Sequence, residues 1–300
     1  MTVTKFTKLY LMSLRPWFWW AAVAPGICGY VWVSPDVVLT DVLALVFVLG
    51  FGLAGFAEMA NELYDAQYDT VQRQFSVFGI NSSGNTKVLE IDYRFAQWSK
   101  TLLFIHLVVT AVISVAVFDV PVVLLIIGSG LGWAYSARPL RLKACALTNI
   151  VAKVIGYGCI AFFIGVNLGG GEFNFGGLAL GCAIGLVQCG FNGIADINDR
   201  TADKENGIFT LPVIVGPTVA ASIYMTFCGI GLGALLYNNV LERTATSSMT
   251  IIITISLVVL CASIAVGVLR STCKKNSTRL SQLHLLSGVT MMTSAIWLLG

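Results

Sequence analysis

The chain has 300 residues, of which 57% are hydrophobic and 11% charged, whereas an average soluble domain is roughly 25% charged. This composition excludes a soluble globular protein and predicts an all-α integral membrane protein with a single domain over residues 1–300. The net charge of +3 at pH 7 is too small to favour a nucleic-acid partner.

Nine apolar runs predict nine transmembrane helices. They cover residues 17–33, 42–60, 98–117, 121–135, 147–166, 177–195, 218–237, 249–269 and 283–299. If the N-terminus is cytosolic, all of the 18 Lys and Arg residues except Arg243 fall on the cytosolic side or its flanks. The positive-inside rule therefore predicts a cytosolic N-terminus and a C-terminus on the opposite side.

The N-terminal segment from Lys5 to Arg15 predicts a short amphipathic lead-in on the cytosolic surface. Arg15 precedes Pro16 at the start of the first apolar run. It either anchors this end at the lipid headgroups or points into a site between the helices.

The second apolar run ends in a polar cluster, Asn61, Asp65 and Asp69, spaced four residues apart. If the helix continues, these three side chains share one face about one turn apart. Burying them at the end of a membrane helix is costly unless a cation binds there. Glu58 and Glu62 flank this cluster, and either could line the same cavity.

Two cytosolic loops carry candidate anion-binding residues. The loop after the second run contains a Gly- and Ser-containing segment, 81–87, that ends at Lys87 and can wrap phosphate. The loop after the fourth run joins a tyrosine to three cations, which either anchor the cytosolic edge or form an anion clamp: Tyr135, Arg138, Arg141 and Lys143.

The sixth apolar run ends in a second acidic cluster, Asp196, Asp199 and Asp203, with Asn192 one turn deeper. Arg200 and Lys204 lie within or directly after it. Spans 1–4 and spans 5–8 thus each place an acidic cluster after their second helix, a repeat that can build a central pocket. Together the clusters predict a divalent-metal site that holds a diphosphate.

The remaining polar residues favour structural roles. His106 has no Cys or carboxylate at ligand spacing, so we expect a hydrogen-bonded core histidine. The eight cysteines show no metal-binding spacing and are expected to be free thiols.

The sequence resembles the UbiA superfamily of intramembrane prenyltransferases. One signature, Asn-x3-Asp-x3-Asp, is met by Asn61, Asp65 and Asp69, and a second, Asp-x2-Asp-x3-Asp, by Asp196, Asp199 and Asp203, followed by Gly207 and Thr210-Leu211-Pro212. The loop from Tyr135 to Lys143 is similar to that of chlorophyll-synthase-like members. The chain departs from the pattern at Glu62, where many members have Asp, and at Pro139, which stands in place of a lysine of the hydroxybenzoate branch. No single branch's acceptor can therefore be carried over.

The resemblance implies an all-α bundle of nine helices and a Mg²⁺-dependent prenyl transfer from a polyprenyl diphosphate to an aromatic or related acceptor. It implies about two Mg²⁺ ions, held by Asp65, Asp69, Asp199 and Asp203 with Asn61 and Asp196. The residues that would bind the diphosphate are Lys87, Tyr135, Arg138, Arg141, Lys143, Arg200 and Lys204. Those that would line the acceptor cavity are Arg15, Glu58, Glu62 and Asn192. Glu58 could contact the acceptor or take its proton.

Two alternative functions fit the same residues. In a UbiA-type terpene cyclase, the donor's own double bond attacks the allylic cation. In a cation transporter, the acids would line a path near the bilayer midplane, but here they gather at the predicted cytosolic ends.

Overall fold

The computed structural model describes residues 3–34, 36–65 and 93–242. These ranges are helical and contain no β-strand beyond one isolated bridge between Cys145 and Phe209. The α-helices are α1 (Val3–Ser13), α2 (Trp20–Val33), α3 (Leu39–Leu45), α4 (Gly55–Asp65), α5 (Tyr93–Phe118), α6 (Val122–Ser136), α7 (Ala146–Lys153), α8 (Ala161–Leu168), α9 (Phe175–Glu205), α10 (Leu211–Val215) and α11 (Pro217–Glu242). The all-α prediction is confirmed for this part of the chain.

Two pairs of helices are joined end to end by π-helical segments. η2 (Val46–Ala54) links α3 to α4, and η4 (Val154–Ile160) links α7 to α8. Short 3₁₀ turns, η1 (Pro16–Phe18) and η3 (Leu142–Ala144), precede α2 and α7. Each α–π–α series therefore runs as one rod, long enough to cross a bilayer.

Seven of the nine predicted spans lie in the described ranges, and each corresponds to a helix. Five are long and apolar enough to cross a membrane, namely Leu39–Tyr64, Trp98–Phe118, Ala146–Leu168, Phe175–Ile197 and Pro217–Asn238. Trp20–Val33 and Val122–Ser136 are shorter apolar helices. The predicted spans 249–269 and 283–299 lie outside the described residues, so the count of nine stays a prediction.

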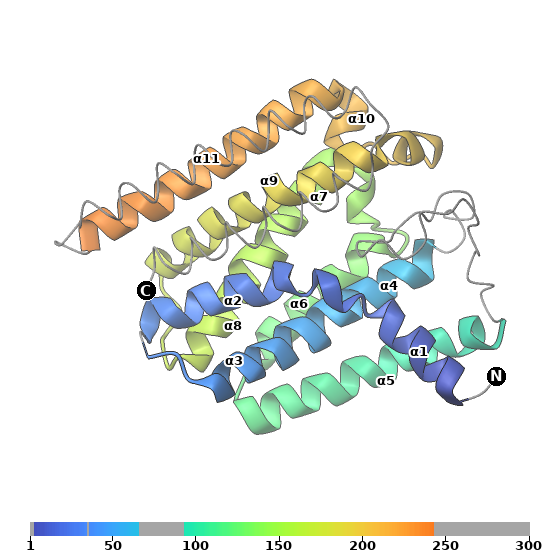
Figure 1. Cartoon of the computed structure of the whole chain (residues 1–300), viewed down its shortest axis with the longest axis horizontal. Coiled ribbons are helices and arrows are strands. Elements are labelled where there is room, and N and C mark those ends of the chain that lie inside the picture. Colours follow the sequence, from blue (N-terminus) through green and yellow to red (C-terminus); the bar gives the residue numbers. More distant parts are fainter. Residues whose placement is uncertain (1–2, 35, 66–92, 243–300) are drawn as a thin grey trace.

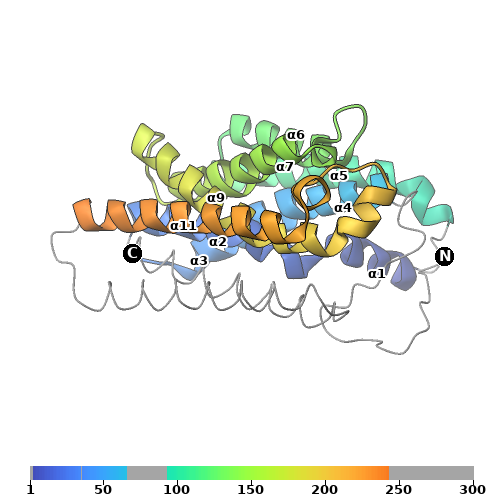
Figure 2. The same ribbon diagram turned by 90° about the horizontal axis from the view of Figure 1, so that it is seen from above.

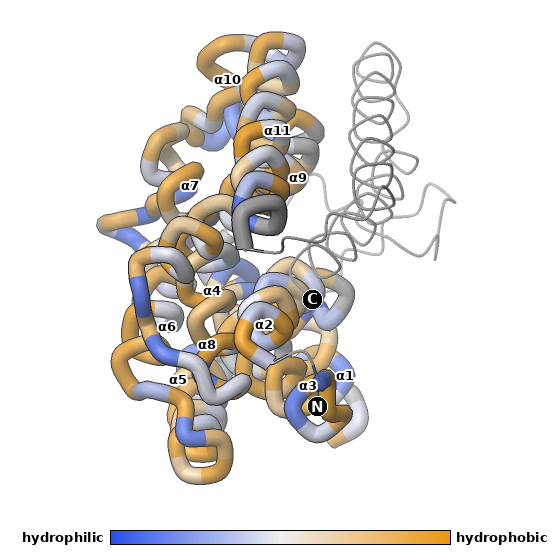
Figure 3. The backbone as a smooth tube through the Cα atoms, turned by 90° about the vertical axis from the view of Figure 1, so that its left-hand side faces the viewer, coloured by the Kyte–Doolittle hydropathy of each residue, from blue (hydrophilic) through white to orange (hydrophobic). Residues whose placement is uncertain are grey.

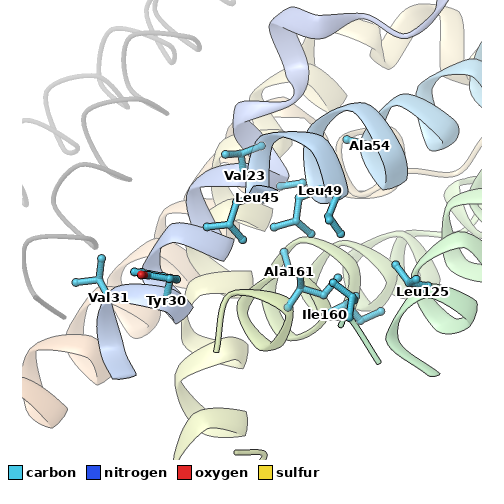
Figure 4. Packing of buried hydrophobic residues seen from close by; sticks show 13 residues of the cluster. Val23, Tyr30, Val31, Leu45, Leu49, Ala54, Leu125, Ile160 and Ala161 are labelled. Carbon is cyan, nitrogen blue, oxygen red and sulfur yellow. The ribbon is translucent and has the colours of Figure 1, made fainter. Parts of the chain in front are cut away.

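The helices pack side by side as a bundle. α11 runs along α9, α2 packs on α8, and α4 packs on α6 (Figure 1, Figure 2). Hydrophobic residues cover most of the length of these helices (Figure 3). The largest buried cluster joins α2, the η2 rod, α6 and the η4 rod through residues such as Val23, Leu49, Leu125 and Ile160 (Figure 4).

Glycine allows the closest of these contacts. A methyl group at Gly165 on α8 would overlap the backbone carbonyl oxygen of Gly26 on α2. Lipid gives helices little hydrophobic reason to associate, so close approach through small residues supplies the packing energy. The glycines expected to allow tight packing in spans 5 and 6 include Gly165.

The fold brings the two polar clusters to one end of the bundle. The C-terminal ends of α4 and α9 both lie at the right-hand end in Figure 1, on the same side as α1. α9 ends at Glu205, Gly207 adopts a positive φ of 66°, and α10 begins beside Pro212.

Candidate active site at the ends of α4 and α9

Lys143 links a described residue of the first cluster to a described residue of the second. Lys143, in η3, donates a hydrogen bond of 2.7 Å to Oδ1 of Asn61, and Ser136 donates one of 2.8 Å to the same atom. Lys143 also interacts electrostatically with Glu58 on α4 and Asp203 on α9. The segment after α6 therefore places an ammonium group within reach of both clusters.

Arg15 points into the helix bundle rather than toward the lipid headgroups. Its backbone is left-handed, with φ of 44°, at the turn before η1. Its guanidinium forms ion pairs with Oε2 of Glu58, at 3.2 Å, and with Oε1 of Glu62. About a fifth of each of these three side chains is exposed, so the triad is mostly shielded from water.

Asp196 is surrounded by donors from the protein. Lys153 donates to Oδ1 at 2.9 Å and to Oδ2 at 2.8 Å, while Asn149 and Tyr224 donate to Oδ2 at 3.2 and 2.9 Å. Lys153 is 5% exposed and Asn149 is 1% exposed. The carboxylate thus sits in a buried network that joins α7, α9 and α11.

Tyr135 and Tyr224 extend this network. Tyr135, near the end of α6, donates a hydrogen bond of 3.0 Å to Oδ1 of Asn149. Tyr224 packs directly against Gly193, where any side chain would overlap its ring. Gly193 therefore allows α11 to bring the Tyr224 hydroxyl to Asp196.

Asp203 lies one turn beyond Asp199 near the end of α9. Its carboxylate accepts a hydrogen bond of 3.0 Å from Thr210, which is 3% exposed. Burial raises the pKa of Asp203 to about 6, although Thr210 and the nearby Lys143 and Lys153 act in the opposite direction. A further cation at this position would stabilise its charged form.

The other predicted residues vary in their surroundings. Arg200 donates from Nε to the carbonyl of Pro212 at 3.0 Å, and Lys204 is exposed. Arg141 has a left-handed backbone, with φ of 37°. Nδ2 of Asn192 is buried and has no hydrogen-bond partner among the described residues.

Part of the predicted metal site cannot be placed. Asp69 and Lys87 lie outside the described residues, as does the side chain of Asp65. Within the described side chains, no three His, Cys, Asp or Glu residues form a group that could hold a metal. The ligand assignments therefore remain predictions.

His106 has the structural role predicted for it. The ring is 4% exposed and is hydrogen bonded to the hydroxyl of Tyr10, at 2.7 Å, and to the carbonyl of Phe51, at 2.9 Å. The described cysteines, Cys28, Cys145, Cys159, Cys182, Cys189 and Cys228, are free thiols, as expected.

Four residues of the site were not predicted from the sequence motifs, namely Lys153, Asn149, Tyr224 and Ser136. Lys153 did carry a signal, because a lysine inside an apolar run is a candidate functional residue by default. Asn149, Tyr224 and Ser136 carried no such signal, since neutral polar residues are common in membrane helices.

Comparisons with known proteins identify the family of this chain. Residues 22–289 match the UbiA prenyltransferase family. The chain is 33% identical over 100 residues to the bacteriochlorophyll synthase 33 kDa chain of Cereibacter sphaeroides, over 31% of this chain and 32% of the relative. With the protein of the same description from Rhodobacter capsulatus, it is 26% identical over 74% of this chain and 72% of the relative.

The fold is also that of solved structures. A UbiA homolog from Archaeoglobus fulgidus, solved bound to GPP and Mg²⁺, superposes with a TM-score of 0.67 at 19% identity, over 97% of this chain and 99% of the homolog. The family match spans most of the sequence and includes the second, fourth and sixth helical spans, whose ends form the site described above. The chain belongs to the UbiA prenyltransferase family.

Proposed function

We propose that this protein is a Mg²⁺-dependent intramembrane prenyltransferase. It ionises a polyprenyl diphosphate and transfers the prenyl group to an aromatic or related acceptor, releasing diphosphate. The observation that carries the proposal is the position of Lys143, which bonds Asn61 of one cluster and interacts electrostatically with Asp203 of the other.

The residues at this end of the bundle suit a divalent cation. Lys143 donates to Asn61, and burial raises the pKa of Asp203 to about 6; both observations support the proposal of a bound cation here. The side chains offered are oxygen donors, which Mg²⁺ prefers. Asn61, Asp65, Asp69, Asp199 and Asp203 would hold about two ions.

Bound Mg²⁺ supplies Lewis-acid stabilisation of the departing diphosphate. The protein's own cations do the same work electrostatically: Lys143 from the centre of the site, and Lys87, Arg138, Arg141, Arg200 and Lys204 around it. Scission of the bond between the allylic carbon and oxygen leaves its electron pair on the diphosphate. The helix walls keep water from the allylic cation until the acceptor attacks.

Glu58 is the residue that we propose to contact the acceptor. Its Oε2 forms an ion pair with Arg15, and its electrostatic interaction with Lys143 supports a position at the inner edge of the same site. A carboxylate one turn deeper than Asn61 can bind a hydroxyl of the acceptor or take the proton that the acceptor loses. Glu62 shares the Arg15 ion pair, and Asn192 offers a buried donor on α9.

The names of the relatives support this reading. Two relatives are bacteriochlorophyll synthase chains, and the structural neighbour from Archaeoglobus fulgidus was solved with GPP and Mg²⁺. We therefore expect a prenyl diphosphate donor here, with an aromatic or tetrapyrrole acceptor as the first to test.

A terpene cyclase is the second candidate, because the same clusters would ionise the donor and the helix walls would equally exclude water. The two functions are separated by incubating membranes with farnesyl or geranylgeranyl diphosphate and Mg²⁺, with and without a panel of phenolic and tetrapyrrole acceptors. A prenylated acceptor in the mass spectrum supports the transferase. A cyclic hydrocarbon or terpene alcohol made without acceptor supports the cyclase instead.

Substitution of a cluster aspartate tests the metal-dependent step. We expect Asp65→Ala or Asp199→Ala to abolish Mg²⁺-dependent turnover while the protein still inserts into the membrane. Lys87→Ala should raise the KM for the donor. Wild-type rates in either aspartate variant would contradict the proposal, and unchanged kinetics for Lys87→Ala would remove that residue from the site.

A further inference from the structure

We infer that Asp196 is a positioning residue, paired permanently with Lys153, and not a ligand of the metal. The inference rests on the proposed function for its reference to Mg²⁺. It concerns Asp196, both of whose carboxylate oxygens accept hydrogen bonds from the protein.

The hydrogen bonds of Asp196 leave little room for a metal. An ionised carboxylate offers about four lone-pair sites. Asp196 accepts four hydrogen bonds from three side chains, Lys153, Asn149 and Tyr224, at 2.8 to 3.2 Å. Three of these bonds are to Oδ2 and one is to Oδ1. A metal ion at Oδ2 would have to displace a donor, and a metal ion at Oδ1 would compete with the Lys153 ammonium for the same oxygen.

Charge leads to the same conclusion. Lys153 is 5% exposed, and its ammonium donates hydrogen bonds to both carboxylate oxygens of Asp196. Moving Asp196 to a metal would leave this ammonium buried without its counter-charge, which is strongly unfavourable. Asp196 is therefore paired with an adjacent ammonium, in contrast to Asp203, whose carboxylate accepts a hydrogen bond from the neutral Thr210.

The network instead fixes the wall between the two clusters. Asp196 holds Asn149, Asn149 accepts from Tyr135, and the neighbouring Ser136 donates to Asn61. Asp196 thereby ties α7, α9 and α11 together and sets the position of Tyr135 at the end of α6. Its effect on the reaction is exerted through the residues that it holds.

The test compares Asp196→Asn, Lys153→Met and the neutral double variant D196N/K153M with Asp199→Asn, a matched control from the same helix and cluster. For each purified protein in detergent, the melting temperature is measured as MgCl₂ is titrated in the presence of inorganic diphosphate. We expect the half-saturating Mg²⁺ concentration to stay within twofold of wild type for Asp196→Asn and to rise at least tenfold for Asp199→Asn.

The ion pair and the positioning role have separate readouts. Lys153→Met alone should lower the melting temperature more than the double variant does, because it leaves a buried carboxylate unpaired. Asp196→Asn and Tyr135→Phe should each slow diphosphate release from geranylgeranyl diphosphate, and together should slow it no more than the stronger single change, because they break one hydrogen-bonded chain. If a single variant does not accumulate in membranes, the Mg²⁺ titration is carried out on the double variant D196N/K153M.

A tenfold rise in half-saturating Mg²⁺ for Asp196→Asn, matching Asp199→Asn, would overturn the inference. Independent, additive effects of Lys153→Met and Asp196→Asn on the melting temperature would also overturn it. If wild type itself shows no Mg²⁺-dependent shift, the proposed metal dependence fails, while the coupling between Lys153 and Asp196 still decides the ion pair.

Discussion

At the scale of single residues, charge inside this bundle is matched group by group. Arg15 is paired with Glu58 and Glu62, Lys153 with Asp196, and Lys143 with the amide oxygen of Asn61. An isolated charge removed from water is far costlier than a paired one, so each cation constrains where its partner can lie. These pairs connect α4 and α9 to the neighbouring segments that carry the cations.

We predict that Arg15→Met destabilises the protein more than Glu62→Gln does. Without the guanidinium, two neighbouring carboxylates repel each other in a partly buried position, whereas Glu62→Gln leaves the pair with Glu58 intact. Breaking a fully buried pair costs roughly 3–5 kcal/mol, and the partial exposure of this triad reduces the expected loss to about 1–3 kcal/mol. Thermal unfolding in detergent, followed by circular dichroism, measures the difference. Equal melting temperatures for the two variants would contradict a structural role for the Arg15 triad.

At the scale of helices, close contacts at glycine set the geometry of the site. Gly165 lets α8 approach α2, and Gly193 lets Tyr224 of α11 reach Asp196 on α9. The π-helical segments η2 and η4 lie in the middle of the two rods; α4, which follows η2, carries Asn61, and η4 begins directly after Lys153. Such π-helical insertions often occur near functional sites, and here each lies one segment away from a residue of the site.

A pair of glycine substitutions separates packing from helix propensity. Gly165→Ala places a methyl group against the carbonyl oxygen of Gly26, and overpacking of this kind costs about 1–3 kcal/mol. Gly130→Ala on α6 meets open space, so alanine should stabilise its helix by about 0.5–1 kcal/mol. We expect the melting temperature to fall for the first variant and to stay or rise for the second. A similar fall in both would show that the contact between α2 and α8 is not decisive.

At the scale of the whole molecule, the candidate active site lies at one end of the bundle. The C-terminal ends of α4 and α9 both lie at the right-hand end in Figure 1, and the basic residues Arg138, Arg141 and Lys143 follow α6. The distribution of basic residues predicts that this end faces the cytosol. A charged diphosphate would then reach the site from water while its prenyl chain lies among apolar helix faces.

This orientation can be tested with reporter fusions in a bacterial inner membrane. A fluorescent protein fused before residue 1 should fluoresce, because it folds in the cytosol. Alkaline phosphatase fused after residue 300 should be active, because it requires the periplasm. A dark N-terminal fusion with an inactive C-terminal phosphatase would reverse the orientation. A fluorescent N-terminal fusion with an inactive C-terminal phosphatase would place both ends in the cytosol and contradict nine spans.

The sequence alone determined where the helices lie and which family the chain belongs to. Hydropathy predicts helices because a backbone in lipid must satisfy its own hydrogen bonds, and all seven predicted spans in the described ranges are helical. The four-residue spacing of Asn61, Asp65 and Asp69 likewise predicts a shared face from helix geometry alone. Local patterns of this kind need no knowledge of the partner helices.

Only the tertiary structure decided which charges pair. Arg15 meets Glu58 and Glu62 from 43 and 47 residues away, and Lys153 meets Asp196 from 43 residues away. In the sequence, Asp196 is indistinguishable from Asp199 and Asp203, and all three read as metal ligands. The distinction arises because α7 and α11 place three donors around Asp196, and helix packing, unlike helix formation, depends on contacts between segments far apart in the chain.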